Sequence, residues 1–161
     1  MSSERTIAVT GGSGFIGSHV VDRLMAAGHH VTVLDVRPPH RPDVAFTQTD
    51  IGDIDRLTEL FHGVDVVFHL AGVSNINDAY ARPVDTIRIN VEGTANIWEA
   101  SRRAGVGRAV LASTVWVYAG ATGSGPFDEE TPFHLPRAGH INTSSNIMMV
   151  LVGNKIDKKE E

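Results

Sequence analysis

The sequence contains no cysteine, which excludes a disulfide framework, a thiolate nucleophile and a cysteine-based zinc site. It has no apolar run of about 18 residues, the length that indicates a membrane-spanning helix. The polar residues 1–5 show no secretory signal, so we expect an intracellular, cytoplasmic protein. The 14 basic residues are outnumbered by 19 acidic ones, and the net charge of −5 disfavours nucleic acid or an anionic membrane as a partner.

Lysine is missing from the first 154 residues, which carry arginine instead. Lys155, Lys158 and Lys159 then follow close together, and no arginine occurs after Arg137. Lysine is normally among the commonest residues of a globular protein. The change in composition therefore indicates that the C-terminal segment differs in origin from the rest of the chain.

The remaining composition is that of one globular domain, with 161 residues of which 42% are hydrophobic and 20% charged. Short β-branched runs alternate with helical patterns, which predicts a three-layer, doubly wound α/β fold with a parallel sheet of about six strands. Strands are expected at residues 6–10, 31–34, 44–48, 64–70, 108–113 and 147–153. Helices are expected at residues 15–27, 53–61 and 84–103. We expect close packing at Gly93, since glycine inside a helix costs about 1 kcal/mol relative to alanine.

Gly11, Gly14 and Gly17 follow the first expected strand with the spacing G-x-x-G-x-x-G. The first glycine permits a sharp turn, the second lets backbone N–H groups approach a pyrophosphate, and the third lets the helix pack closely on the sheet. The helix begins with Phe15 and Ile16, and its free N–H groups and positive dipole end would face the anion. An ordinary glycine-rich turn is the alternative, but the strand before and the helix after are the context for dinucleotide binding.

Asp35 stands at the end of the second expected strand, where a dinucleotide site carries its acidic residue. Its carboxylate would accept hydrogen bonds from the adenosine ribose hydroxyls. It would also repel a 2′-phosphate, by on the order of 4 kcal/mol at a separation of about 4 Å and an effective dielectric of about 20. We therefore expect NAD as the cofactor in preference to NADP. Arg37 either weakens this preference or is a solvated loop residue.

Six segments of the chain carry recognisable landmarks in a fixed order. They are residues 10–17, Asp35, 49–51, 69–72, 90–94 and 113–118. Together they resemble the extended short-chain dehydrogenase/reductase family, and more narrowly its NAD-dependent epimerase/dehydratase branch, which acts on nucleotide sugars. The resemblance covers residues 1 to about 141 and implies a Rossmann-type domain that binds NAD, with a nucleotide sugar as a possible second ligand. Separately, we expect no metal site, because His29 and His30 are neighbours beside a turn and neighbouring strand residues point in opposite directions.

The resemblance also implies roles for residues at the cofactor. Asp50 would bind the adenine amino group, the Ile51 amide would meet the ring, and Asn90 would belong to the cofactor and active-site network. The adenosine and diphosphate would be lined by Leu70, Ala71 and Gly72. Two alternatives stay open: Asp50 caps a turn, and Ala71 and Gly72 serve close packing alone.

For catalysis, the resemblance implies that Thr114, with Ser113 beside it, supplies the hydroxyl that hydrogen-bonds the reacting group of the substrate. This hydroxyl would lie at the carboxyl edge of the sheet. An ordinary strand-end threonine is the alternative. The family's Tyr-x-x-x-Lys pair should fall near residue 142, where Asn142 and Asn146 occupy both positions. Because losing a general acid/base typically costs about 10²- to 10⁴-fold in rate, we expect impaired catalysis. A non-enzymatic dinucleotide-binding module and an oxidoreductase that uses another acid are the alternatives.

Residues 148–157 resemble the guanine-reading strand of Ras-like small GTPases, with Asn154, Lys155 and Asp157 in the Asn-Lys-x-Asp pattern. That family also needs a phosphate loop with a Gly-Lys pair, which the chain lacks, so we expect no guanine-dependent activity. We infer a chimera: a dehydrogenase body, 1–141, followed by a GTPase-like sixth strand and charged tail, 142–161, in place of the family's substrate domain. Such a joint would arise by design, as an α/β scaffold, or by an accident of gene structure, and natural divergence of one continuous chain is the alternative. The substrate and the oligomeric state stay open.

Overall fold

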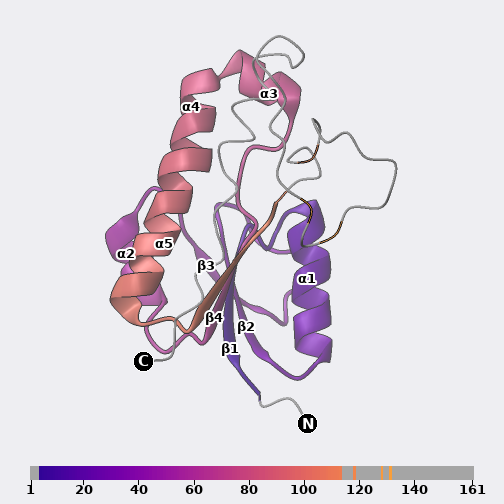
Figure 1. Cartoon of the computed structure of the whole chain (residues 1–161). Coiled ribbons are helices and arrows are strands. Elements are labelled where there is room, and N and C mark those ends of the chain that lie inside the picture. Colours follow the sequence, from indigo (N-terminus) through magenta and orange to yellow (C-terminus); the bar gives the residue numbers. More distant parts are fainter. Residues whose placement is uncertain (1–3, 114–117, 119–127, 129–130, 132–161) are drawn as a thin grey trace.

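A computed structural model of the chain describes residues 4–113 together with 118, 128 and 131. Its described strands form one parallel sheet in the order β3-β2-β1-β4-β5. The strands are β1 (Thr6–Thr10), β2 (His30–Asp35), β3 (Ala45–Gln48), β4 (Val66–His69) and β5 (Arg108–Leu111). This arrangement confirms the predicted doubly wound fold (Figure 1). The sixth strand predicted at 147–153 lies outside the described residues and stays a prediction.

The helices lie in two layers. They are α1 (Phe15–Ala26), α2 (Ile54–Leu60), α3 (Ile76–Ala81), α4 (Pro83–Ile87), the π-helical segment η1 (Arg88–Glu92) and α5 (Gly93–Ala104). α1 covers one face of the sheet, and α2 and α5 cover the other (Figure 1).

The core is divided between the two faces by the alternation of side chains along β1. Ala8 faces α2 and α5, where it belongs to a cluster with Phe61 and Ile97. Its neighbours Ile7 and Val9 point to the opposite face, toward α1. Phe61 and Val9 are completely inaccessible to solvent. The buried apolar area on both faces fixes the two helical layers and thereby the ends of the strands.

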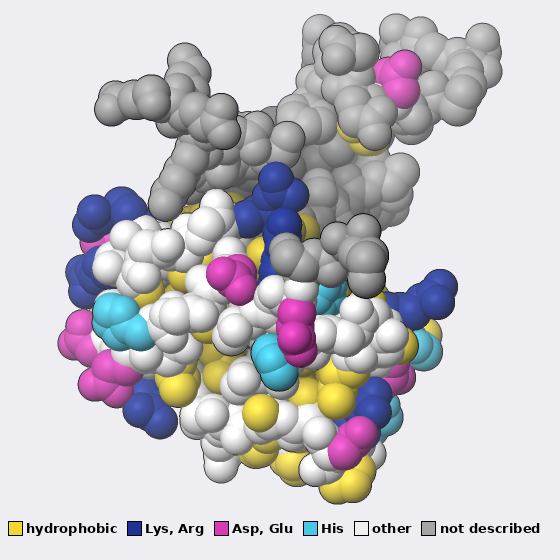
Figure 2. Space-filling view, turned by 90° about the horizontal axis from the view of Figure 1, so that it is seen from below, with side chains coloured by type: hydrophobic (Ala, Val, Ile, Leu, Met, Phe, Trp, Pro, Cys, Tyr) yellow, Lys and Arg dark blue, Asp and Glu magenta, His cyan; other side chains and the backbone are white. Residues whose placement is uncertain are grey.

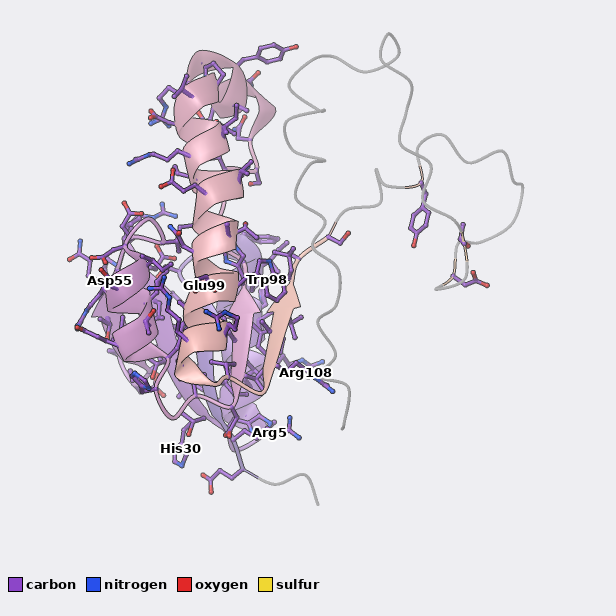
Figure 3. The ribbon with its side chains drawn as sticks, turned by 60° about the vertical axis from the view of Figure 1, so that its left-hand side comes forward. Arg5, His30, Asp55, Trp98, Glu99 and Arg108 are labelled. Atoms are coloured by element: carbon purple, nitrogen blue, oxygen red, sulfur yellow. The ribbon has the colours of Figure 1, made fainter. Side chains whose placement is uncertain are left out.

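Arg103 links α2 and α5 on the outer surface. Its guanidinium lies 2.9 Å from Glu99 on its own helix and 3.5 Å from Asp55 on α2. Figure 3 shows Asp55 and Glu99 on these neighbouring helices. α5 ends at Gly105, whose φ of 75° gives the left-handed C-terminal turn that glycine favours.

Two helical features differ from the prediction. The helix predicted over 84–103 is interrupted by η1, which has π-helical hydrogen bonding. The short helix α3 was not predicted; it is capped by Asn75, whose Oδ1 accepts from the Asn77 N–H at 2.8 Å. The packing expected at Gly93 is confirmed, because a Cβ there would lie 2.5 Å from Ile51 Cδ1.

The outer surface carries charges of both signs. Figure 2, seen from the end at which β1 begins, shows acidic and basic side chains interspersed over that face. None of the helices among the described residues has both the length and the apolar character needed to cross a bilayer.

Candidate functional site

The glycine-rich turn leads directly from β1 into α1. Gly11 has a φ of +70°, and its carbonyl accepts from the Gly14 N–H at 3.0 Å. A Cβ on Gly11 would lie 2.5 Å from the Ala71 backbone nitrogen. Both the backbone conformation and the close approach of the neighbouring loop therefore require glycine, as the sequence predicts for the first position of the motif.

The third glycine has a different contact from the one expected. A Cβ on Gly17 would lie 2.0 Å from the carbonyl oxygen of Gly11, so this glycine lets α1 close on the turn rather than on the sheet. A Cβ on Gly14 would approach only that same oxygen, at 3.2 Å. The space in front of Gly14 is therefore free of the described protein atoms, as a cradle for an anion requires.

The first turn of α1 offers free hydrogen-bond donors. Gly14 is the N-cap and makes no side-chain capping bond, and the first turn carries no acidic residue. Within the described part of the chain, the N–H groups of Phe15 and Ile16 have no protein acceptor. Both side chains are exposed, by 84% and 62%. The predicted site at these two residues thus consists of their backbone amides and the helix dipole.

Asp35 joins the glycine turn to the end of β2. Its Oδ2 accepts from the Ser13 N–H and its Oδ1 from the Arg37 N–H, both at 3.1 Å. The Ser13 hydroxyl completes the link by donating to the Arg37 carbonyl at 2.7 Å. A carboxylate has about four acceptor positions, so each oxygen of Asp35 retains one for a ligand hydroxyl.

A cleft of about 260 Å³ lies at the carboxyl ends of the strands, between β1 and β4, where the strand order reverses. In doubly wound folds this switch point is where ligands bind. It is lined by nine predicted residues: Gly11, Gly14, Asp35, Arg37, Asp50, Ile51, Leu70, Ala71 and Gly72. Leu34, Val36, Thr49, Val73 and Ile89 complete the lining. The landmarks at the ends of β1, β2, β3 and β4 thus converge on one place.

The loop after β3 forms one wall of this cleft. Asp50 Oδ1 accepts from the Gly52 N–H at 2.8 Å, so the turn-capping alternative is realised, while the residue also lines the cleft. The side chain of Ile51 is buried, at 8% exposure. Its N–H makes no hydrogen bond to any residue that the structure describes. This loop therefore brings an acceptor, the Asp50 carboxylate, and a free donor, the Ile51 N–H, to the same wall of the cleft.

Asn90 lies behind the cleft rather than in its lining, and it is 5% exposed. Its Oδ1 accepts from the Val73 N–H at 2.7 Å and its Nδ2 donates to the Val73 carbonyl at 3.0 Å. The side chain is thereby committed to holding Val73, which does line the cleft. Its expected place in the cofactor network stays a prediction, and through Val73 it would be an indirect one.

The sequence reading missed a buried chain of hydrogen bonds centred on His69, which is 3% exposed. Its Nδ1 lies 2.7 Å from Thr10 Oγ1, and its Nε2 lies 3.0 Å from Thr94 Oγ1. Thr94 donates its single hydroxyl proton to the Asn90 carbonyl at 2.7 Å. We therefore assign the His69 proton to Nε2, with Nδ1 accepting from Thr10.

Burial lowers the pKa of His69 to about 4, so the ring is neutral at physiological pH. The chain of hydrogen bonds joins the ends of β1 and β4 to η1. The sequence signal for this network is the polar residue His69 within the apolar run 64–70, because a buried polar side chain needs hydrogen-bond partners.

Of the predicted catalytic residues, the structure describes Ser113, which is exposed just beyond the carboxyl end of β5 and does not line the cleft. Thr114, Asn142 and Asn146 lie outside the described residues. Among the residues that the structure does describe, no group of three or more His, Cys, Asp or Glu side chains is placed to hold a metal ion.

A groove of about 480 Å³ lies between α5 and β5, away from the cleft. Trp98 and Arg108 line it, and Figure 3 shows both on this side of the molecule. It contains none of the residues predicted to bind a cofactor.

Comparison with known proteins agrees with the geometry. The model of the NAD-dependent epimerase/dehydratase family matches residues 7–141. A UDP-glucose 4-epimerase of Neisseria meningitidis serogroup A is 34% identical over 142 residues, which cover 80% of this chain and 42% of that protein.

Two solved structures are similar in fold and sequence. MoeE5 in complex with UDP-glucose and NAD has a TM-score of 0.70 at 32% identity, over 81% of this chain and 42% of that one. A UDP-glucose-4-epimerase from Stenotrophomonas maltophila, with bound NAD and formylated UDP-arabinopyranose, has a TM-score of 0.72 at 27% identity. That match covers 81% of this chain and 43% of the epimerase. The chain thus spans about two-fifths of the length of these relatives, and it belongs to the NAD-dependent epimerase/dehydratase family.

Proposed function

We propose that the domain binds NAD in the cleft, in preference to NADP, and does so through its adenosine and diphosphate portions. The observation that carries this proposal is that free N–H groups at the start of α1 and unused acceptor positions of Asp35 occur at the same site. Donors at the helix end suit a diphosphate, and carboxylate acceptors suit ribose hydroxyls. The NAD named in two similar structures supports the same cofactor.

Each part of the adenosine diphosphate portion of NAD has a counterpart in the chain. The amides of Phe15 and Ile16 would hold the diphosphate in front of Gly14, where no side chain intrudes. Asp35 would accept from the ribose, and Asp50 with the Ile51 amide would meet the adenine. When bound, NAD supplies a hydride acceptor; these residues bind and orient it.

The proposal includes impaired turnover. In the family pattern Thr114 and Ser113 would contact the hydroxyl of a nucleotide sugar, but Asn142 and Asn146 stand where the acid/base tyrosine and its lysine are expected. An asparagine amide does not exchange protons near neutral pH as a general acid/base must. The two asparagines also favour the second candidate function, a dinucleotide-binding module without turnover.

The turnover prediction is tested by following the conversion of UDP-glucose and other nucleotide sugars into product in the presence of NAD, because epimerisation returns the hydride to the sugar and accumulates no NADH. Because the acid/base is missing, we expect rates at least about 10²-fold below those of a full-length UDP-glucose 4-epimerase assayed in parallel. A rate comparable with that of the epimerase would contradict the impairment and would show that another group acts as the acid.

Replacing Asp35 with alanine tests the proposed ribose contact. Hydrogen bonds to a charged group contribute about 1.5–3 kcal/mol, so NAD affinity should fall by roughly 10- to 100-fold. Without the carboxylate, a 2′-phosphate is no longer repelled, so the preference for NAD over NADP should shrink. Isothermal titration calorimetry with both dinucleotides measures the two effects.

Asp78→Ala, at an exposed position on α3, is the matched control and should bind NAD as the unmodified protein does. Unchanged NAD affinity in Asp35→Ala would remove Asp35 from the site. Failure of the unmodified protein to bind NAD at all would overturn the proposed function.

A further inference from the structure

The loop of residues 49–52 is held from behind by α5. The amide nitrogen of Asn96 lies 3.1 Å from the Ile51 carbonyl oxygen and 3.3 Å from the Gly52 carbonyl oxygen. A side-chain amide has two N–H donors, one for each carbonyl. A single side chain on α5 therefore fixes two successive peptide units of the cleft wall.

Gly93 lies three residues before Asn96, on the same side of α5. A Cβ at this position would lie 2.5 Å from Ile51 Cδ1 and 2.7 Å from Ile51 Cγ1. The missing side chain thus makes the socket into which Ile51 inserts. With its side chain inserted at Gly93 and its carbonyl bound by Asn96, Ile51 has little freedom to shift or turn.

The clamped loop carries the two groups that are proposed above to meet the adenine. Asp50 is the acceptor, and the Ile51 N–H is a donor without a partner in the described structure. Adenine offers the complementary pair, an exocyclic amine that donates and an adjacent ring nitrogen that accepts. A 6-oxopurine offers the reverse at both positions, a carbonyl oxygen and a ring N–H, so it would place acceptor against acceptor and donor against donor.

We propose that Asn96 and Gly93 are positioning residues that set the base specificity of the cleft, by holding Asp50 and the Ile51 N–H in the arrangement that accepts a 6-aminopurine and rejects a 6-oxopurine. This inference rests on the proposed binding of NAD. Neither residue lines the cleft, so both act through the loop.

The test compares NAD with nicotinamide hypoxanthine dinucleotide, which differs only at the purine, by calorimetry on the whole chain. The unmodified protein should bind NAD more tightly. Asn96→Ala removes two hydrogen bonds, so NAD affinity should fall roughly tenfold while affinity for the hypoxanthine analogue changes much less. Asn96→Asp keeps the size but turns an oxygen toward the two carbonyls, and it should lose the discrimination at least as completely.

Gly93→Ala disturbs the same loop at its other contact, the packing of Ile51. It should also lower the ratio of the affinity for NAD to that for the hypoxanthine analogue. Asn77→Ala, which removes an exposed amide on α3, is the matched control and should keep the ratio. A lower ratio in the Asn96 variants supports the proposal. If both affinities fall by the same factor, or neither falls, Asn96 has a merely structural role or none, and the proposal is wrong. If the unmodified protein binds neither dinucleotide, the proposed function itself fails.

Discussion

Replacing Gly17 with alanine is expected to abolish measurable NAD binding, with a loss of at least about 100-fold in affinity, or about 2.7 kcal/mol. The added Cβ would lie 2.0 Å from the Gly11 carbonyl oxygen. The backbone fixes the position of both atoms, so no side-chain rotation can relieve the clash. The turn must therefore open, which displaces Gly14 and the amides at the start of α1. Calorimetric titration with NAD measures the loss.

Gly63→Ala is the control for general destabilisation. Gly63 has a φ of +77° with no atom within 4 Å of its missing Cβ, so alanine there costs about 1–2 kcal/mol of backbone strain and causes no clash. It precedes β4, at the edge of the sheet opposite the cleft, and its variant should bind NAD normally. Near-normal NAD affinity in Gly17→Ala would show that the diphosphate does not rest on this turn.

Replacing His69 with glutamine should remove a large part of the acid sensitivity of the fold. In the native protein the pKa of His69 is about 4, below the ordinary value of 6.5, because burial penalises the charged ring. As pH falls from about 6.5 to about 4, the unfolded chain therefore takes up this proton first, and the free energy of unfolding decreases. A shift of this size corresponds to on the order of 3 kcal/mol.

Urea denaturation between about pH 7 and pH 4 measures this contribution as the difference in the free energy of unfolding between the unmodified protein and His69→Gln. His69→Gln should be less stable than the unmodified protein at neutral pH, where the hydrogen bonds to Thr10 and Thr94 are lost, and the gap should narrow toward pH 4. His62→Gln, at an exposed position, should keep the original pH dependence. A constant gap across the pH range would mean that His69 is not held neutral by burial.

The elements built from local patterns were predictable. β1 coincides with the predicted strand 6–10, because an apolar run between polar residues and a glycine turn needs no distant information. The convergence of Gly11, Asp35 and Asp50 on one cleft also followed from the sequence, since parallel strands bring their carboxyl ends to the same edge.

The contacts that were missed join residues far apart in the chain. His69 lies 59 positions from Thr10 and 25 from Thr94, and Asn96 lies 45 positions from Ile51. No spacing in a single sequence specifies such pairs, because they depend on which faces the folded layers bring together. The short helix α3 was missed for a different reason, since six residues are too few to show a helical period.

The π-helical hydrogen bonding of η1 has a consequence for how the gene can change. Each π-type turn accommodates one residue more than an α-type turn, so the helix on one side is rotated by about 100° relative to an uninterrupted α-helix. Deleting one codon between 88 and 92 would restore regular geometry and would either remove Asn90 or change its position relative to Val73. Single-residue deletions should therefore be tolerated in the exposed loop before β3 and selected against in η1.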